Sequence, residues 1–167
     1  AVALSLTVVD GVNLGFIKPL IARPRPLESH VLQRLVVVTN HYRAEGYSFF
    51  SSHAANAFVV AVFFSLLVRD RIFSAFMTAW SITLSATRLY LGVHYPSDIL
   101  AGMLFGSVVA ALVYYLYRRI YARCSDKLHY ISTKYTQTGY SFADVDVVIC
   151  VLLLTFIYAA FRAVLSI

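Results

Sequence analysis

The sequence predicts an all-α protein, a polytopic bundle of helices that cross a membrane. Of its 167 residues, 60% are hydrophobic and only 13% are charged, and the mean hydropathy is +0.74. A soluble domain typically contains about 25% charged residues. The apolar residues also gather in runs of about 20 residues, the length that a helix needs to cross a bilayer. Composition and run length therefore argue against an ordinary soluble domain.

Polar and charged segments divide the chain into five apolar stretches, each of which we expect to form a helix. The first stretch is short for a membrane span, so we expect further helices to precede it in the intact protein. In the fourth stretch, the spacing of Gly102 and Gly106 predicts close packing against a neighbouring helix. The five expected helices are residues 1–17, 53–68, 72–91, 97–117 and 145–167.

Three parts are expected along the chain: a membrane core at 1–123, a polar loop at 124–144 and an additional C-terminal transmembrane helix at 145–167. The net charge of +6 falls mostly in short loops beside apolar segments, as is typical of membrane proteins. It therefore does not indicate a nucleic-acid partner. The two cysteines, Cys124 and Cys150, define no disulfide framework.

A cationic segment follows the first expected helix. Residues 18–26 contain three cations and three prolines. Because proline interrupts the helical hydrogen bonds and restricts the residue before it, we expect a stiff, extended loop that holds Lys18, Arg23 and Arg25 in set positions. Asp10, eight residues before Lys18, is expected to share a helix face with it and to make a buried structural hydrogen bond.

The connection at residues 27–49 is long and polar. A loop of this length in a small domain often serves as a lid or a binding element, here for a lipid head group. We expect a short interfacial helix at 31–38, and we expect His30 and His41 to be surface residues rather than ligands.

The next helix begins with Ser51, Ser52 and His53. Serine is a good N-cap residue, and capping alone would explain both serines. The same geometry also offers free backbone N–H groups at the positive end of a helix, which form a site for an anion. His53 falls in the first turn and would face that site.

Residues 87–98 place a cation, an imidazole and a carboxylate within twelve residues. We expect Asp98 to hydrogen-bond His94 across a tight Tyr-Pro-Ser turn, which leaves the other ring nitrogen free to attack or to accept a proton. Ser97 is the expected N-cap of the following helix, whose dipole favours the ionised carboxylate. The alternative is a loop that only caps two helices. The cation of this stretch is Arg88.

Successive membrane crossings bring these groups to one face. The first expected helix ends on the side where the second begins, and the third ends where the fourth begins. The opposite face carries ordinary flanking cations and is expected to be cytoplasmic. The site then lies on the periplasmic or outer face of the inner membrane. The residues gathered there are Lys18, Arg23, Arg25, Ser51, Ser52, His53, Arg88, His94 and Asp98.

Several cations beside a helix N-terminus predict a pocket for a multiply charged anion, most naturally phosphate. Two histidines then divide the work: His94 is expected to attack phosphorus, and His53 to protonate the leaving oxygen. A metal site built from both histidines and Asp98 is the alternative. Because the cations would repel a divalent metal, we expect neither a metal nor another cofactor.

Three motif blocks resemble those of the type 2 phosphatidic acid phosphatase superfamily, which also includes vanadium haloperoxidases and bacterial acid phosphatases. The blocks span residues 18–98, about half of the chain. The first is Lys, six residues, then Arg-Pro; the second is Pro-Ser-Gly-His; the third is Ser-Arg, five residues, His, three residues, Asp. They are matched here by Lys18, Arg25 and Pro26; by Phe50, Ser51, Ser52 and His53; and by Thr87, Arg88, His94 and Asp98.

The resemblance implies a six-helix membrane core, with two helices before the first one here, and metal-free catalysis through a phosphohistidine. It implies that His94 attacks phosphorus, that Asp98 orients and charges the His94 ring, and that His53 is the general acid. The implied ligands of the phosphoryl oxygens are Lys18, Arg25, Ser51, Ser52 and Arg88.

Three residues depart from the family pattern. Phe50 stands in place of Pro and should loosen the turn. Ser52 stands in place of Gly, so the backbone there must avoid positive φ or accept strain. Thr87 replaces Ser and keeps a hydroxyl. Because every charged participant is present, we expect activity.

The hypothesis is therefore a membrane lipid phosphatase of the bacterial envelope. Its expected partners are the bilayer and an anionic lipid, such as undecaprenyl pyrophosphate or lipid A phosphate. Phosphatidylglycerol phosphate and phosphatidate are alternatives, as is a phosphotransferase that moves a head group between carriers. A non-catalytic lipid-binding or transport protein would need the cations but not the two histidines and Asp98.

Overall fold

The computed structural model describes residues 1–28, 45–124, 135–136 and 138–165. The expected interfacial helix at 31–38 lies outside these residues, as do His30 and His41. The all-α prediction is confirmed, since the described elements are all helical apart from one isolated bridge between Tyr135 and Ser141. The elements are α1 (Val2–Val12), the π-helical turn η1 (Asn13–Ile17), α2 (Lys18–Ile21), the 3-10 turn η2 (Pro26–Glu28), α3 (Ser52–Val68), α4 (Arg71–Tyr90), α5 (Pro96–Cys124) and α6 (Phe142–Leu165).

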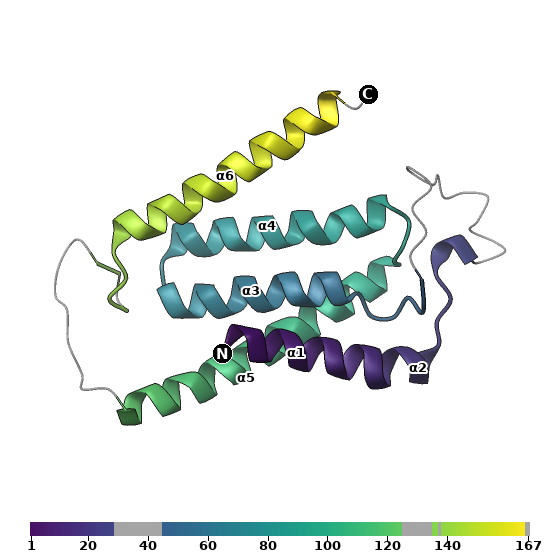
Figure 1. Ribbon diagram of the computed structural model, residues 1–167, viewed down its shortest axis with the longest axis horizontal. Coiled ribbons are helices and arrows are strands. Elements are labelled where there is room, and N and C mark those ends of the chain that lie inside the picture. Colours follow the sequence, from purple (N-terminus) through teal and green to yellow (C-terminus); the bar gives the residue numbers. More distant parts are fainter. Residues whose placement is uncertain (29–44, 125–134, 137, 166–167) are drawn as a thin grey trace.

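The helices form a bundle in which α3 and α4 run antiparallel, α5 crosses them, and the stretch from α1 to α2 lies along α3 and α5 (Figure 1). α6 lies on the outer side of α4, contacts it with its first half and slopes away from it toward the C-terminus. Two helical stretches among the described residues, Val2–Glu28 and Pro96–Tyr121, are long and apolar enough to cross a membrane, and α3 is a shorter apolar helix.

The first helix continues past the point where we expected it to end. α1, η1 and α2 follow one another without a break, so the prediction of an extended loop from Lys18 onward was wrong for its first four residues. Proline clashes with the carbonyl four residues before it in a regular α-helix. Here the wide π-helical turn directly before α2 changes the hydrogen-bond pattern and accommodates Pro19. The helix ends at Ala22, which has a left-handed φ of 46°.

The closest packing in the bundle joins α3 to α5. A Cβ atom added at Gly102 would lie 2.6 Å from the Ser51 carbonyl oxygen, and one at Gly106 would lie 2.1 Å from that of Ala55. Any side chain at these positions would overlap backbone, which confirms the predicted close approach. A buried cluster of Val9, Phe50, Ala55, Val59 and Val109 ties α1 to the same pair of helices.

Two helix boundaries differ from the prediction. α5 continues to Cys124, seven residues beyond the expected end at 117, and α6 begins at Phe142 rather than at 145. Within the polar segment before α6, the Thr138 hydroxyl donates to the Val68 carbonyl at 3.0 Å. This contact ties the segment to the end of α3.

Candidate active site

The ends of four helical stretches meet at one end of the bundle, as the topology predicted. Beside them lies a cavity of about 930 Å³, lined by the stretch from α1 to α2, by α3 and α4, and by the loops before α3 and α5. Cations and histidines lie at its polar end, and apolar side chains continue along α1, α3 and α4 away from that end. The lining residues used below are Lys18, Arg25, Ser52, His53, Arg88 and His94, together with Leu6, Asp10, Leu14, Asn56, Ala57, Val60, Trp80 and Leu84.

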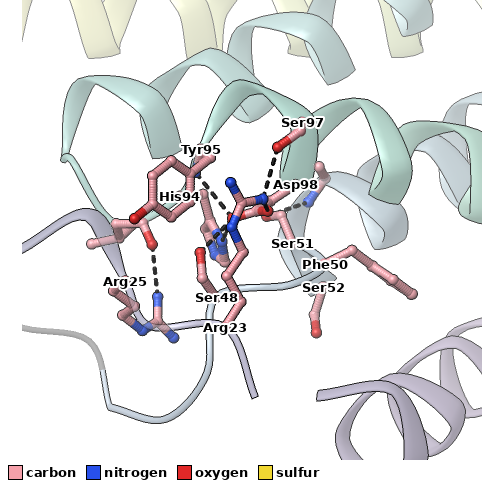
Figure 2. A network of polar contacts seen from close by, with 12 residues as sticks. Arg23, Arg25, Ser48, Phe50, Ser51, Ser52, His94, Tyr95, Ser97 and Asp98 are labelled. Carbon is pink, nitrogen blue, oxygen red and sulfur yellow. Dashed lines mark hydrogen bonds and ion pairs between the residues drawn. The ribbon is translucent and has the colours of Figure 1, made fainter. Parts of the chain in front are cut away.

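Asp98 lies at the centre of a buried polar cluster beside this cavity (Figure 2). Its side chain has no exposed surface. Arg23 Nη1 donates to Asp98 Oδ1 at 2.7 Å, the Ser48 hydroxyl donates to Oδ2, and the Tyr95 backbone N–H donates to Oδ2 at 3.0 Å. Three donors from three parts of the chain therefore hold the Asp98 side chain in place.

The way in which α5 begins explains the hydrogen bond from the Tyr95 N–H to Asp98. The helix begins at Pro96, so Tyr95 is the N-cap and Asp98 is the third helical residue. A carboxylate at this position reaches back to the N-cap N–H, as in a capping box. The prediction of Ser97 as N-cap was wrong by two residues, because proline is well suited to the first helical position. The Ser97 hydroxyl instead accepts from Arg23 Nη1 at 2.8 Å.

Arg23 and Ser48 are site residues whose roles sequence reasoning missed. The Arg23 guanidinium lies 3.9 Å from the centre of the Tyr95 ring, a cation–π contact, while it also pairs with Asp98. The alternation of Arg and Pro from Arg23 onward was a signal that both arginines are fixed. No comparable signal marked Ser48, which lies in a polar loop.

His94 is buried, with 6% of its surface exposed. Its Nδ1 lies 3.7 Å from Asp98 Oδ2, which is too long for the expected hydrogen bond, so the carboxylate acts on the ring through charge. Burial lowers the pKa of His94 to about 4, and the nearby Arg25 contributes in the same direction. Asp98 raises the pKa but does not outweigh these effects. His94 is consequently neutral at pH 7, the form in which an imidazole is a nucleophile.

Arg25 supports the loops around the site more than we expected. Its Nε donates to the Gly46 carbonyl at 2.8 Å, Nη1 to that of Val93 at 3.0 Å and Nη2 to that of Glu45 at 2.8 Å. The side chain is buried and also lines the cavity. Arg25 thus joins the segment before α3 to the turn before His94, and Figure 2 shows it directed toward that turn.

The remaining charged groups at the polar end face the cavity. Lys18 and Arg88 are half-buried, and His53 is exposed into the cavity. Within the described part of the chain, none of the three side chains has a hydrogen-bond partner, and the Nε of Arg88 is buried without one. A buried guanidinium N–H without an acceptor is costly. These three groups are therefore available to an anionic ligand.

The two serines predicted to bind phosphate have different surroundings. Ser51 is fully buried and caps α3 by accepting from the Ala54 N–H at 3.4 Å, and it is not among the cavity-lining residues. Ser52 does line the cavity. Its hydroxyl oxygen accepts from Asn13 Nδ2 at 2.7 Å, so the hydroxyl hydrogen remains available to a ligand.

The structure accommodates two of the departures from the family pattern, Phe50 and Ser52. Phe50 was expected to loosen it, but its ring is buried and lies 4.9 Å from that of Phe105 on α5. Aromatic packing thus anchors the position that proline would hold. Ser52 is the first residue of α3 and avoids positive φ, which among the described non-glycine residues occurs only at Ala22 and Arg69.

Fold and site together define an all-α protein with a cavity lined by cationic and histidine side chains at the ends of its helices. The chain belongs to the PAP2 superfamily, whose family model matches residues 1–122. This match includes all three motif blocks.

Similar curated proteins carry lipid phosphatase names. The lipid A 4′-phosphatase of Bacteroides thetaiotaomicron is 40% identical over 124 residues, which cover 74% of this chain and 55% of that protein. The lipid A 4′-phosphatase of Porphyromonas gingivalis is 34% identical over 125 residues, 74% of this chain and 51% of that protein. The phosphatidylglycerophosphatase B of Haemophilus influenzae is 33% identical over 86 residues, 46% of this chain and 36% of that protein. The chain thus spans about half the length of the first two relatives. No solved structure matches it.

Proposed function

We propose that this protein is an integral membrane phosphatase that hydrolyses the phosphate of an anionic lipid through a phosphohistidine at His94. The observation that carries the proposal is the cavity itself. A buried, neutral imidazole lies at its polar end beside cationic and histidine side chains that have no hydrogen-bond partner among the described residues. Binding alone would need the cations, whereas a neutral buried His94 beside a carboxylate suits nucleophilic attack.

The reaction proceeds in two steps. A ring nitrogen of His94 attacks phosphorus, the phosphorus–oxygen bond to the lipid breaks, and His53 gives its proton to the leaving oxygen. Water then attacks the phosphohistidine, His53 takes the proton of that water, and inorganic phosphate leaves. Asp98 stabilises the positive charge that forms on the imidazole in the first step.

The cations stabilise the charge on the phosphoryl oxygens. Arg88 and Lys18 carry most of this role, because both are free of other hydrogen bonds within the described chain. Ser52 contributes its hydroxyl and backbone N–H. Arg25 contributes charge while its guanidinium holds the loops. Ser51 contributes indirectly, since it caps α3, the helix that begins with Ser52 and His53.

We assign no metal or other cofactor to the mechanism, because the cations supply the charge stabilisation that a metal would supply elsewhere. The test is phosphate release in the presence of EDTA. Full activity is the expected result. A loss that Mg²⁺ or Zn²⁺ restores would contradict the mechanism.

A lipid A phosphate is the substrate that we favour. The support is the similarity to proteins named lipid A phosphatases, together with apolar cavity walls on α1, α3 and α4. Of these, the stretch that contains α1 is long and apolar enough to cross a membrane. A head group at the helix ends and acyl chains in the bilayer would fit this arrangement. We place the protein in the inner membrane of a bacterial envelope as a multi-pass protein, with its site on the periplasmic face.

The test is a screen of purified protein for inorganic phosphate release. The substrates are lipid A, undecaprenyl pyrophosphate, phosphatidylglycerol phosphate and phosphatidate, each in the same detergent, with His94→Ala as the control. Lipid A should give the highest rate. Highest release from phosphatidylglycerol phosphate would instead favour the function that the Haemophilus relative is named for. Transfer of phosphate to a second lipid without its release would indicate a phosphotransferase.

A further inference from the structure

The cavity holds a second polar feature, a pair of side chains below the phosphate end. Asn56 Nδ2 donates to both carboxylate oxygens of Asp10, at 3.0 and 3.1 Å. The hydrogen bond predicted for Asp10 is therefore present, and it joins α1 to α3. Both residues line the cavity, so the pair is open to a ligand as well as structural.

Asp10 and Asn56 lie at a defined distance from the phosphate end of the cavity. Asn56 is three residues beyond His53, about 4.5 Å further along a helix. Along the continuous stretch from α1 to α2, Asp10 lies about two helical turns before Lys18, and Leu14 between them also lines the cavity. Beyond the pair the lining is apolar, from Leu6, Val60 and Trp80 among others. A ligand with its phosphate at His53 would place the atoms next to the phosphate beside Asp10 and Asn56.

The free atoms of the pair are hydrogen-bond acceptors. The Nδ2 of Asn56 is committed to Asp10, and its Oδ1 is buried without a partner among the described residues. A carboxylate only accepts and has lone pairs left over after two bonds. An acceptor in apolar surroundings is costly to leave unpaired and strong when paired. The pair therefore favours a ligand that brings donors.

We propose that Asp10 and Asn56 select lipid phosphates that carry a hydroxyl or amide N–H a few atoms from phosphorus. This inference rests on the proposed phosphatase activity and adds a substrate class to it. Saccharolipids and sphingoid lipids have such donors, whereas phosphatidate has only ester acceptors there and polyprenyl phosphates have hydrocarbon. A site built to hydrogen-bond a donor discriminates against an analogue that lacks it.

The test compares two lipid phosphates of similar size. Ceramide 1-phosphate carries an amide N–H and a hydroxyl near its phosphate, and phosphatidate with matched acyl chains carries neither. We expect the wild-type kcat/KM to favour ceramide 1-phosphate by about 10- to 100-fold, the range for hydrogen bonds to a charged acceptor. Asp10→Asn keeps the size of the side chain and should reduce the ratio several-fold. The double variant Asp10→Leu with Asn56→Leu should bring it close to one.

The ratio of the two lipid activities distinguishes a change in selectivity from a folding defect, because misfolding lowers both activities equally. Each ratio is measured on one preparation, with p-nitrophenyl phosphate as a small reference substrate that brings no hydrogen-bond donor to the pair. Asp146→Asn, on the exposed surface of α6, is the matched control and should keep the wild-type ratio. Equal losses on both lipids, or an unchanged ratio in the double variant, would show that the pair only joins two helices. Absence of phosphate release from every lipid would overturn the proposed function, and this inference with it.

Discussion

Two groups of polar residues lie side by side at the helix ends, and they differ in where their hydrogen-bond partners come from. In the Asp98 cluster (Arg23, Ser48, Tyr95 and Asp98), the carboxylate receives its hydrogen bonds from the protein itself. In the cavity group (Lys18, His53 and Arg88), no described residue supplies a hydrogen-bond partner. The comparison suggests that the first group builds the site and that the second is left open for the ligand. Changes in the cavity group should alter activity more than stability, and changes in the Asp98 cluster should alter both.

The largest expected effect is the loss of lipid phosphatase activity in His53→Ala. If His53 protonates the leaving oxygen, its loss should cost about 10²–10⁴-fold on a lipid phosphomonoester. It should cost little on p-nitrophenyl phosphate, whose leaving group is stable as an anion. Both rates are measured on one detergent-purified preparation. Equal losses on the two substrates would assign His53 to binding or folding instead.

Arg88→Lys is expected to have the next largest effect. A guanidinium holds two phosphoryl oxygens in a fixed fork, and an ammonium does not. The rate should fall about 10²-fold, the scale of removing one oriented transition-state donor, while the unfolding temperature stays within error. Arg71→Lys, at the other end of α4, is the control. An unchanged rate would place Arg88 outside the phosphate site.

Ser48→Ala tests the Asp98 cluster. The substitution removes a hydrogen bond to a fully buried carboxylate and should lower the free energy of unfolding by about 1–3 kcal/mol. Ser107→Ala is the matched control, since that hydroxyl bonds only within its own helix; its effect should stay within about 0.5 kcal/mol. Thermal unfolding in one detergent measures both. If the two variants unfold alike, the role given to Ser48 is wrong.

The smallest expected effect is a displaced titration. His94 should titrate near its lowered pKa of about 4 rather than at 6.5, mainly because it is buried. Asp98→Asn removes a charge that raises this pKa and should lower it further. Because the folded-state pKa lies below the unfolded one, His94 contributes its full stability above pH 6.5 and loses it as pH falls toward 4. Histidine NMR, with the His94 signal assigned from His94→Gln, measures the pKa. A titration midpoint at or above 6.5 would contradict the proposed effect of burial on the His94 ring.

The main features of the fold could be read from the sequence, because apolar run length and polar boundaries fix the helices. Motif spacing and the count of crossings likewise brought Lys18, His53, Arg88 and His94 to one end. The helical continuation through Pro19 was not predictable, since it depends on a π-helical turn that leaves no composition signal.

The partners of charged groups were the hardest part to predict. The sequence placed Asp98 beside His94, but Asp98 bonds to Arg23 and Ser48, and His94 remains 3.7 Å away. Such pairings depend on how a loop folds back in three dimensions. Sequence spacing restricts only residues on the same helix or turn.

The central claim is that His94 forms a covalent bond to phosphorus, and the most direct measurement is to trap that intermediate. Protein is mixed with a lipid A substrate labelled with ³²P at its phosphates, quenched in base within milliseconds, and analysed for acid-labile, base-stable phosphate on the chain. We predict labelled wild-type protein, stronger labelling if breakdown is slowed, and no label on His94→Ala. Rapid turnover by His94→Ala, or label that remains on that variant, would contradict the claim.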